Sequence, residues 1–167
     1  MCIRDSYRPD EYVNREQMSK FIVKAFSFTT NESLTPDFPD IDPKSKFIAE
    51  INTLKALNIV TGYSDGTYRP SNFVTRAEVT KFVGLSIHQK GIDISGELPN
   101  IFPDVSNDNT FAYYINYLAQ NKVNETPIIS GFSDGTFGPD LSLTRGQMAK
   151  IIWNSMEYVK VQLSSSD

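Results

Sequence analysis

The sequence predicts a mainly α-helical protein built from tandem helical repeats. The first observation is a nine-residue block at 62–70 that returns at 131–139 with the same Ser-Asp-Gly-Thr centre. The second is a Thr-Arg pair that follows each block at the same distance, at 75–76 and 144–145. The third is the run after each pair, where apolar residues recur at the spacing of an amphipathic helix. Self-similarity of this kind is the signature of a repeat architecture.

Each full repeat opens with Phe-Pro-Asp, at 38–40 and 102–104. The residue before a proline avoids the helical region, so this tripeptide predicts an extended start. The two copies are 64 positions apart, whereas the Asp-Gly copies are 69 apart, which leaves five extra residues in the second unit. We place them in the loop-like stretch around residues 124–128.

A partial third copy opens the chain. Residues 7–17 align with residues 68–78 without a gap, whereas the front half of that repeat is missing. We therefore expect the C-terminal half of the first repeat at 7–28, the second repeat at 38–90, the third repeat at 102–160, and a tail or linker at 161–167.

Residues 1–6 do not resemble the rest of the chain. They lack the apolar core of roughly 7–15 residues that a signal peptide needs, and they match the translation of a common sequencing adapter. We hypothesise that they are a non-native leader and that truncation removed the signal peptide. A longer read of the gene, with another sequence before Tyr7, would confirm this. The single cysteine, Cys2, lies in this leader.

Two short amphipathic helices are expected in the front halves, at 47–57 and 111–120. Their apolar faces are formed by Ile48, Ile51 and Leu54 in the first and by Ile115 and Leu118 in the second. The Ser-Asp-Gly-Thr segment that follows each helix predicts a tight turn. Gly66 and Gly135 supply the positive φ of this turn without steric cost.

A longer helix is predicted to begin after each Thr-Arg pair or its equivalent. A cap residue is followed three positions later by Glu or Gln in all copies: Asn14 with Gln17, Thr75 with Glu78, and Thr144 with Gln147. In this capping box each side chain satisfies a free backbone N–H of the other residue. The apolar residues expected on the inner faces are Met18, Phe21, Ile22 and Ala25; Val79, Phe82 and Val83; and Met148, Ile151 and Ile152.

An arginine follows each cap, at Arg15, Arg76 and Arg145. A cation in the first turn opposes the helix dipole and costs about 0.3–1 kcal/mol where it is exposed. Two explanations stay open and need not exclude each other. The arginine can join the free N–H groups in binding an anion such as a carboxylate. Alternatively, it pairs internally with Asp40 or Asp104 of the Phe-Pro-Asp segments.

The composition narrows the class of protein. A net charge of −4 with interspersed signs argues against a nucleic-acid binder, and no apolar run approaches the roughly 18 residues of a membrane span. The only histidine, His88, is expected at a helix end on the surface. After Asp65 the alternate positions hold Thr67 and Arg69, which does not fit a calcium loop. We therefore predict no catalytic residue, no metal site and no cofactor.

The aromatic residues near the turns receive structural interpretations. For Tyr63, Tyr68, Phe132 and Phe137, pinning the turn is favoured slightly over stacking on sugars. Trp153 does not recur in the other repeats, so packing in the core is favoured over a sugar platform.

The combination of Phe-Pro-Asp, Gly-Tyr-Ser-Asp-Gly-Thr-Tyr-Arg-Pro and Thr-Arg-Ala-Glu closely resembles the S-layer homology (SLH) domain. The resemblance covers residues 7 to about 159. It implies a pseudo-threefold spindle around a central three-helix bundle, located outside the cell in the wall or S-layer. It also implies that grooves in the spindle bind secondary cell-wall polysaccharide attached to peptidoglycan, an anionic polymer that often carries pyruvate ketals.

The same resemblance supplies the candidate ligand-binding residues. By position they are Arg15, Arg76 and Arg145, with the turn residues Asp65, Gly66, Asp134 and Gly135. The third repeat departs from the family pattern, with Gly138 where the other copies have arginine and Gly146-Gln147 in place of Ala-Glu. Two rival functions remain. The chain is the anchoring end of a secreted wall-active enzyme, with a fused cargo domain in the parent protein, or it self-assembles in a surface lattice without polysaccharide.

Overall fold

The computed structural model describes residues 7–30, 33 and 35–165. Within these residues the chain is mainly helical, as predicted. Its elements are α1 (Arg15–Ala25), α2 (Ile48–Ala56), α3 (Arg76–Gln89), α4 (Ala112–Gln120), the two-residue strands β1 (Lys122–Val123) and β2 (Thr126–Pro127), and α5 (Arg145–Ser164). No helix among the described residues combines the length and apolar character needed to cross a membrane.

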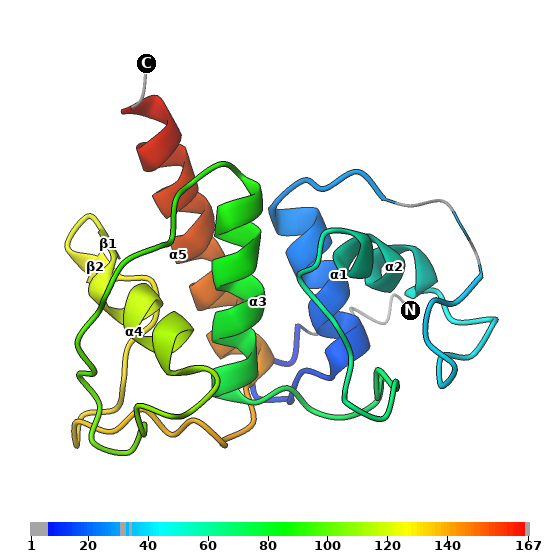
Figure 1. Ribbon diagram of the computed structural model, residues 1–167, viewed down its shortest axis with the longest axis horizontal. Helices are drawn as coiled ribbons and strands as arrows, with labels where there is room; N and C mark the ends of the chain where they lie inside the picture. The colour runs from blue at the N-terminus through cyan, green and yellow to red at the C-terminus, as the bar shows by residue number, and fades with distance from the viewer. Residues whose placement is uncertain (1–6, 31–32, 34, 166–167) are drawn as a thin grey trace, which may run out of the picture.

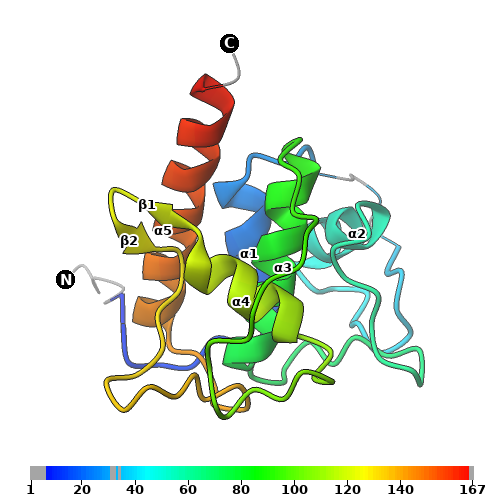
Figure 2. The ribbon, with the colours of Figure 1, turned by 60° about the vertical axis from the view of Figure 1, so that its left-hand side comes forward.

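The helices that begin at an arginine lie at the centre of the molecule. α1, α3 and α5 contact one another, while α2 packs against α1 and α4 packs against α3. In Figure 1, α4 and α2 therefore occupy opposite flanks. The last turns of α5 project beyond the other helices, as Figure 2 also shows from a second direction.

The capping boxes set the starts of the three central helices. The side chains of Asn14, Thr75 and Thr144 each accept a hydrogen bond from the N–H three residues later, and the reciprocal bond is also present in each case. The predicted starts are confirmed. The two front helices are confirmed as well, since α2 and α4 lie within the ranges expected for them.

The segments before the capped helices form a closed ring of backbone hydrogen bonds. The N–H of Val13 donates to the carbonyl of Leu143, that of Leu143 to Val74, and that of Val74 to Val13, each at 3.0 Å. All three side chains are fully buried. The same cyclic order recurs in isolated bridges that join Tyr12 to Thr144, Asn14 to Phe73, and Thr75 to Ser142. Each repeat, including the partial first one, is thus bonded to both of the others.

The aspartates of the Phe-Pro-Asp segments hold the turns. Asp40 accepts hydrogen bonds from the N–H groups of Tyr68 and Arg69 at 2.8 and 2.7 Å, and Asp104 binds the corresponding two N–H groups of the third repeat. Among the described residues neither aspartate forms an ion pair. The expected internal pair of a helix-start arginine is therefore not formed with these aspartates, whose carboxylates bind backbone N–H groups. An internal pair is present at Arg15, where the partner is Glu78.

Two glycines shape each turn, for different reasons. Gly66 and Gly135 have φ of +81° and +87°, as predicted. Gly62 and Gly131 are required by close approach, since a Cβ on Gly62 would lie 2.6 Å from the ring of Phe38. The equivalent Cβ in the third repeat would meet Phe102 in the same way. Gly62 in addition has a φ of +74°.

Two aromatic residues of the turns are buried, whereas Trp153 is exposed. Tyr68 and Phe137 are fully buried, and their tilted rings pack against the phenylalanines of the Phe-Pro-Asp segments with centroids 5.2 Å apart, which confirms that they pin the turn. The expectation for Trp153 is wrong, because this side chain is 64% exposed. The equivalent position on α3, Gly84, lies directly against Tyr114 of α4. Among the described residues no short helix covers α5 in this manner.

Two further segments have more regular structure than the sequence suggested. The five extra residues belong to a hairpin rather than a plain loop, with β1 and β2 joined by Asn124 and Glu125 at φ of 47° and 65°. Two consecutive left-handed residues give the turn whose twist matches paired strands. At the other end, α5 continues through Ser164 into the stretch expected to be a tail or linker. His88 is exposed in the last turn of α3, as predicted.

Candidate binding grooves

Three pockets lie between neighbouring repeats, and each has one helix-start arginine in its wall. We call them the Arg15 groove, the Arg76 groove and the Arg145 groove; their volumes are about 140, 190 and 400 Å³. Four positions are matched in all three: Arg15 with Glu78, Lys81 and Phe82; Arg76 with Gln147, Lys150 and Ile151; and Arg145 with Gln17, Lys20 and Phe21. Each groove therefore takes its arginine from one repeat and its other matched residues from the next repeat in the ring.

The arginines reach their grooves by binding the neighbouring turn. The Nε atoms donate to backbone carbonyls: Arg15 to Tyr68 at 2.7 Å, Arg76 to Phe137 at 2.8 Å, and Arg145 to Tyr7 at 2.9 Å. Each guanidinium also lies over the ring of that same partner, at 4.7, 4.7 and 5.2 Å. These contacts are worth more than the unfavourable placement near the helix dipole costs.

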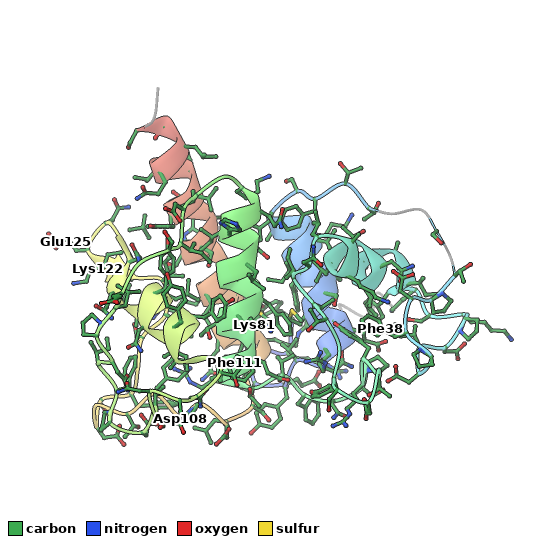
Figure 3. All side chains as sticks on the ribbon, viewed as in Figure 1. Phe38, Lys81, Asp108, Phe111, Lys122 and Glu125 are labelled. Atoms are coloured by element: carbon green, nitrogen blue, oxygen red, sulfur yellow. The ribbon has the colours of Figure 1, made fainter. Side chains whose placement is uncertain are left out.

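The Arg15 groove contains an internal ion pair. Nη1 of Arg15 lies 2.9 Å from Oε1 of Glu78, and the two side chains are only 5% and 14% exposed. The hydroxyl of Tyr63 donates to the same Oε1 at 3.0 Å, and Oε2 accepts from the N–H of Thr75. Burial raises the pKa of Tyr63. Figure 3 places Lys81 on α3 next to Phe111 at the start of α4, and both line this groove.

The Arg76 groove is lined by residues at the same positions of the repeats, but it has no acidic residue. Nη2 of Arg76 donates to the carbonyl of Ser130 at 2.8 Å, while Gln147 occupies the position of the glutamate and Phe132 replaces the tyrosine. Burial lowers the pKa of Arg76, and the charge of Asp104 opposes this shift. An arginine stays protonated despite such a shift. None of the residues lining this groove is acidic.

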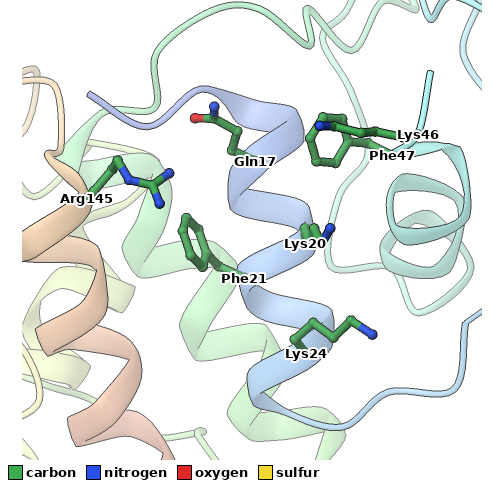
Figure 4. Close-up of a pocket in the computed structure, with 7 residues that line it drawn as sticks. All are labelled: Gln17, Lys20, Phe21, Lys24, Lys46, Phe47 and Arg145. Atoms are coloured by element: carbon green, nitrogen blue, oxygen red, sulfur yellow. The ribbon is translucent and has the colours of Figure 1, made fainter. Parts of the chain in front are cut away.

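The Arg145 groove is wider and more basic. Its arginine lies 5.5 Å from the ring of Phe21, and the remaining cations on its wall are Lys20, Lys24 and Lys46. Figure 4 shows Arg145 directed from α5 toward Phe21 on α1, with Phe47 beyond α1 on the side away from Arg145. The other two grooves have a further wall that precedes the Ser-Asp-Gly-Thr turn, at 59–63 and 128–132, and this groove has no counterpart among its lining residues.

The structure brings three of the seven predicted site residues into grooves. These are the arginines. Asp65, Gly66, Asp134 and Gly135 lie on exposed turns outside the lining of the three grooves, and a ligand-binding role for them stays a prediction.

The two turn aspartates are engaged by their own turns. The Asp65 carboxylate accepts hydrogen bonds from the side chain and backbone N–H of Thr67 and also pairs with Arg69. These contacts lower the pKa of Asp65. Thr136 lowers the pKa of Asp134 in the same way.

Sequence reasoning missed the lysines of the grooves, Lys20, Lys81 and Lys150. They recur at the sixth residue of each capped helix, in Arg-Glu-Gln-Met-Ser-Lys, Arg-Ala-Glu-Val-Thr-Lys and Arg-Gly-Gln-Met-Ala-Lys. A register comparison across the three copies would have found them. The lysine lies five residues, more than one helical turn, beyond the arginine of its own helix. It therefore does not line the groove of that arginine, but the groove that contains the arginine of the preceding repeat.

Comparison with known proteins supports the interpretation of these repeats. The model of the S-layer homology domain matches residues 37–80 and 101–149, together more than half of the chain. The chain is 27% identical over 139 residues to the middle cell wall protein of Brevibacillus brevis, and the aligned region covers 81% of this chain and 12% of that protein. It is 32% identical over 151 residues to an endoglucanase of a Bacillus species, and this alignment covers 88% of the chain and 15% of the endoglucanase.

A third relative is the cellulosome-anchoring protein of Acetivibrio thermocellus, 32% identical over 100 residues, which covers 58% of this chain and 20% of that protein. The chain thus spans between 7% and 20% of the length of the curated relatives it matches. S-layer homology domains are non-catalytic modules that anchor proteins to the cell surface. On its repeats and its matched motifs, the chain belongs to the S-layer homology domain family and is located at the cell wall or surface layer.

Proposed function

We propose that the chain holds its parent protein on the cell surface by binding an anionic, pyruvylated secondary cell-wall polysaccharide in the grooves between its repeats. The observation that carries this proposal is the matched set of arginine, lysine and apolar residue in all three grooves. A guanidinium recognises a carboxylate through paired donors, the lysine adds charge, and an apolar floor suits the faces of a sugar ring or a ketal methyl group.

The domain boundaries and the spindle arrangement are part of the same proposal. We assign residues 7–28, 38–90 and 102–160 to three S-layer homology units, the first without its front half, arranged with pseudo-threefold symmetry around a bundle of α1, α3 and α5. The closed ring of hydrogen bonds among Val13, Val74 and Leu143 supports this assignment, since each unit provides the same position to it.

Co-sedimentation with purified bacterial walls tests the proposal. Walls are compared before and after chemical removal of their secondary polymer, and binding is expected only to the intact walls. Equal binding to stripped and intact walls would contradict the polysaccharide as ligand. A lattice of self-associating copies predicts instead that the protein sediments with its own aggregates in the absence of any wall.

Two variants separate binding from folding. Lys150 is exposed, so Lys150→Ala should weaken binding to intact walls by roughly three- to tenfold and change the free energy of unfolding by less than about 0.5 kcal/mol. Arg76→Ala should weaken binding at least as much and also destabilise the fold, since it leaves two carbonyls unpaired. Unchanged binding for both variants would assign the grooves a structural role only.

The parent protein's activity is a separate proposal. One relative is an endoglucanase, which favours the possibility that this chain is the anchoring end of a wall-active enzyme. In that case, a glycan-hydrolysis assay on the full-length parent protein would give activity, and the same assay on residues 7–165 would give none.

A further inference from the structure

Among the positions at which the Arg15 and Arg76 grooves differ, two contact each other in the Arg15 groove and change its charge. Glu78 and Tyr63 in the first are replaced by Gln147 and Phe132 in the second. In the Arg15 groove the tyrosine hydroxyl donates to the glutamate. The third repeat has neither the hydroxyl donor nor the carboxylate acceptor. Its two residues at these positions are both uncharged.

This exchange changes the charge that surrounds each arginine. Arg15 binds a backbone carbonyl through Nε and Glu78 through Nη1, whereas Arg76 binds two backbone carbonyls through Nε and Nη2. Among the described residues each guanidinium keeps one Nη atom without a hydrogen-bond partner, but only the charge of Arg15 is compensated by a carboxylate. Counting the matched residues only, the Arg15 groove carries Arg15, Lys81 and one carboxylate, whereas the Arg76 groove carries two cations and no carboxylate.

An incoming carboxylate meets different costs in the two grooves. In the Arg15 groove it must lie beside Glu78 or displace it. Displacement would leave the hydroxyl of Tyr63 and the cap N–H of Thr75 without the acceptor that they now share. Like charges held this close in a half-buried site disfavour binding strongly. In the Arg76 groove neither cost arises.

We infer that Glu78 sets the charge selectivity of the Arg15 groove, so that the Arg76 groove is the primary site for the acidic sugar and the Arg15 groove accepts a neutral sugar of the same polymer. This inference rests on the proposed function, because it assumes that the grooves bind the polysaccharide.

The chain itself supplies the matched control for a test. Gln17 and Gln147 complete the same capping box that Glu78 completes, so Glu78→Gln removes the charge and keeps the cap. Gln147→Glu makes the reverse change in the Arg76 groove. All proteins also carry Arg145→Ala, so that the wider third groove does not contribute; if this background does not fold, Lys20→Glu replaces it. Folding is checked by circular dichroism.

The probe is a methyl glycoside of an amino sugar that carries a pyruvate ketal, studied by titration calorimetry. Its control is the same glycoside with a neutral isopropylidene ketal. We expect one strong site for the pyruvylated probe in the background protein and a second after Glu78→Gln. We expect at least a tenfold loss of affinity after Gln147→Glu, and a single site again in the double exchange. The neutral control should not distinguish the variants.

The outcomes separate the two proposals. Two equal sites in the background protein, or no response of the pyruvylated probe to either exchange, would overturn the role of Glu78 and leave the proposed function intact. Loss of binding in all proteins, with no sedimentation on intact walls, would overturn both. A response of the neutral probe equal to that of the charged probe would show that shape rather than charge is selected, and would also overturn the role of Glu78.

Discussion

At the scale of single residues, the arginine after each cap performs two tasks. It ties its own helix to the turn of the next repeat through a carbonyl and an aromatic ring, and the rest of its largely buried guanidinium lines a groove. The structural task explains why a cation is tolerated at a helix start in every copy. The same side chain can therefore be indispensable for the fold and for the ligand, which makes its neighbours better probes of binding.

A buried hydroxyl offers a test at this scale. The hydroxyl of Tyr68 donates to the carbonyl of Arg15 at 2.9 Å and contacts that of Ser19, and burial raises the pKa of Tyr68 to about 12. Tyr68→Phe should cost about 1–2 kcal/mol of unfolding free energy in urea titrations, because two buried groups lose a partner. The third repeat shows how phenylalanine fits this position: the residue equivalent to Ser19 is Thr80, whose hydroxyl donates to a carbonyl of its own helix, as that of Ser19 does. No loss on Tyr68→Phe would mean that the bond from Ser19 to Arg15 is sufficient without the tyrosine hydroxyl.

At the scale of elements, local signals predicted well and non-local ones did not. The capping boxes and the apolar spacing depend on neighbours within one turn of a helix, so α1, α3 and α5 could be placed from the sequence. The partner of Arg15 lies 63 positions away, at Glu78, and nothing in the local pattern identifies it. Trp153 was misjudged for the same reason, because its exposure depends on which helix covers α5.

The turns before the capped helices separate two causes of glycine preference. A Cβ on Gly66 would have no atom within 4 Å, so Gly66→Ala should cost only the strain of a positive φ, about 1 kcal/mol. A Cβ on Gly62 would also collide with Phe38 and with a backbone carbonyl, so Gly62→Ala should cost clearly more. Thermal unfolding of the two variants side by side measures the difference. Equal losses would indicate that Phe38 moves aside without cost.

The same turns should make the fold sensitive to acid. Desolvation opposes ionisation of Asp104, yet the N–H groups of Phe137 and Gly138 outweigh it and lower the pKa of this carboxyl. A carboxyl whose pKa is lowered on folding stabilises the folded state at pH values above its unfolded pKa of about 3.9. This stabilisation is lost as the pH falls through its pKa in the folded state. Urea midpoints should therefore decline below about pH 4, and less steeply for Asp104→Asn. An identical slope in the variant would place the acid sensitivity elsewhere, for example at Asp65 or Asp134.

At the scale of the whole molecule, the ring couples the first described residues to the last repeat. A linear repeat array can open from one end, since each unit contacts only its neighbours. Here the amide of Val13 is bonded to Leu143, so opening any one repeat breaks bonds to both others. The sequence shows the repeats, but their cyclic order follows from tertiary contacts that no single repeat encodes.

Hydrogen exchange measures this coupling. The amide protons of Val13, Val74 and Leu143 should exchange with the same free energy, equal to that of global unfolding from urea titration. The equality is expected because the three bonds form a single closed set around buried side chains. Much faster exchange at Val13 alone would indicate that the partial first repeat opens independently of the other two.

The ring also limits how the architecture can grow. In a strand ladder the outermost unit always leaves a row of unpaired donors and acceptors on which another unit can be added. The three ring residues use their N–H groups and carbonyls on one another, so the set has no edge. A fourth unit of the same kind would have to break one of these bonds to enter, so the ring is complete with three units.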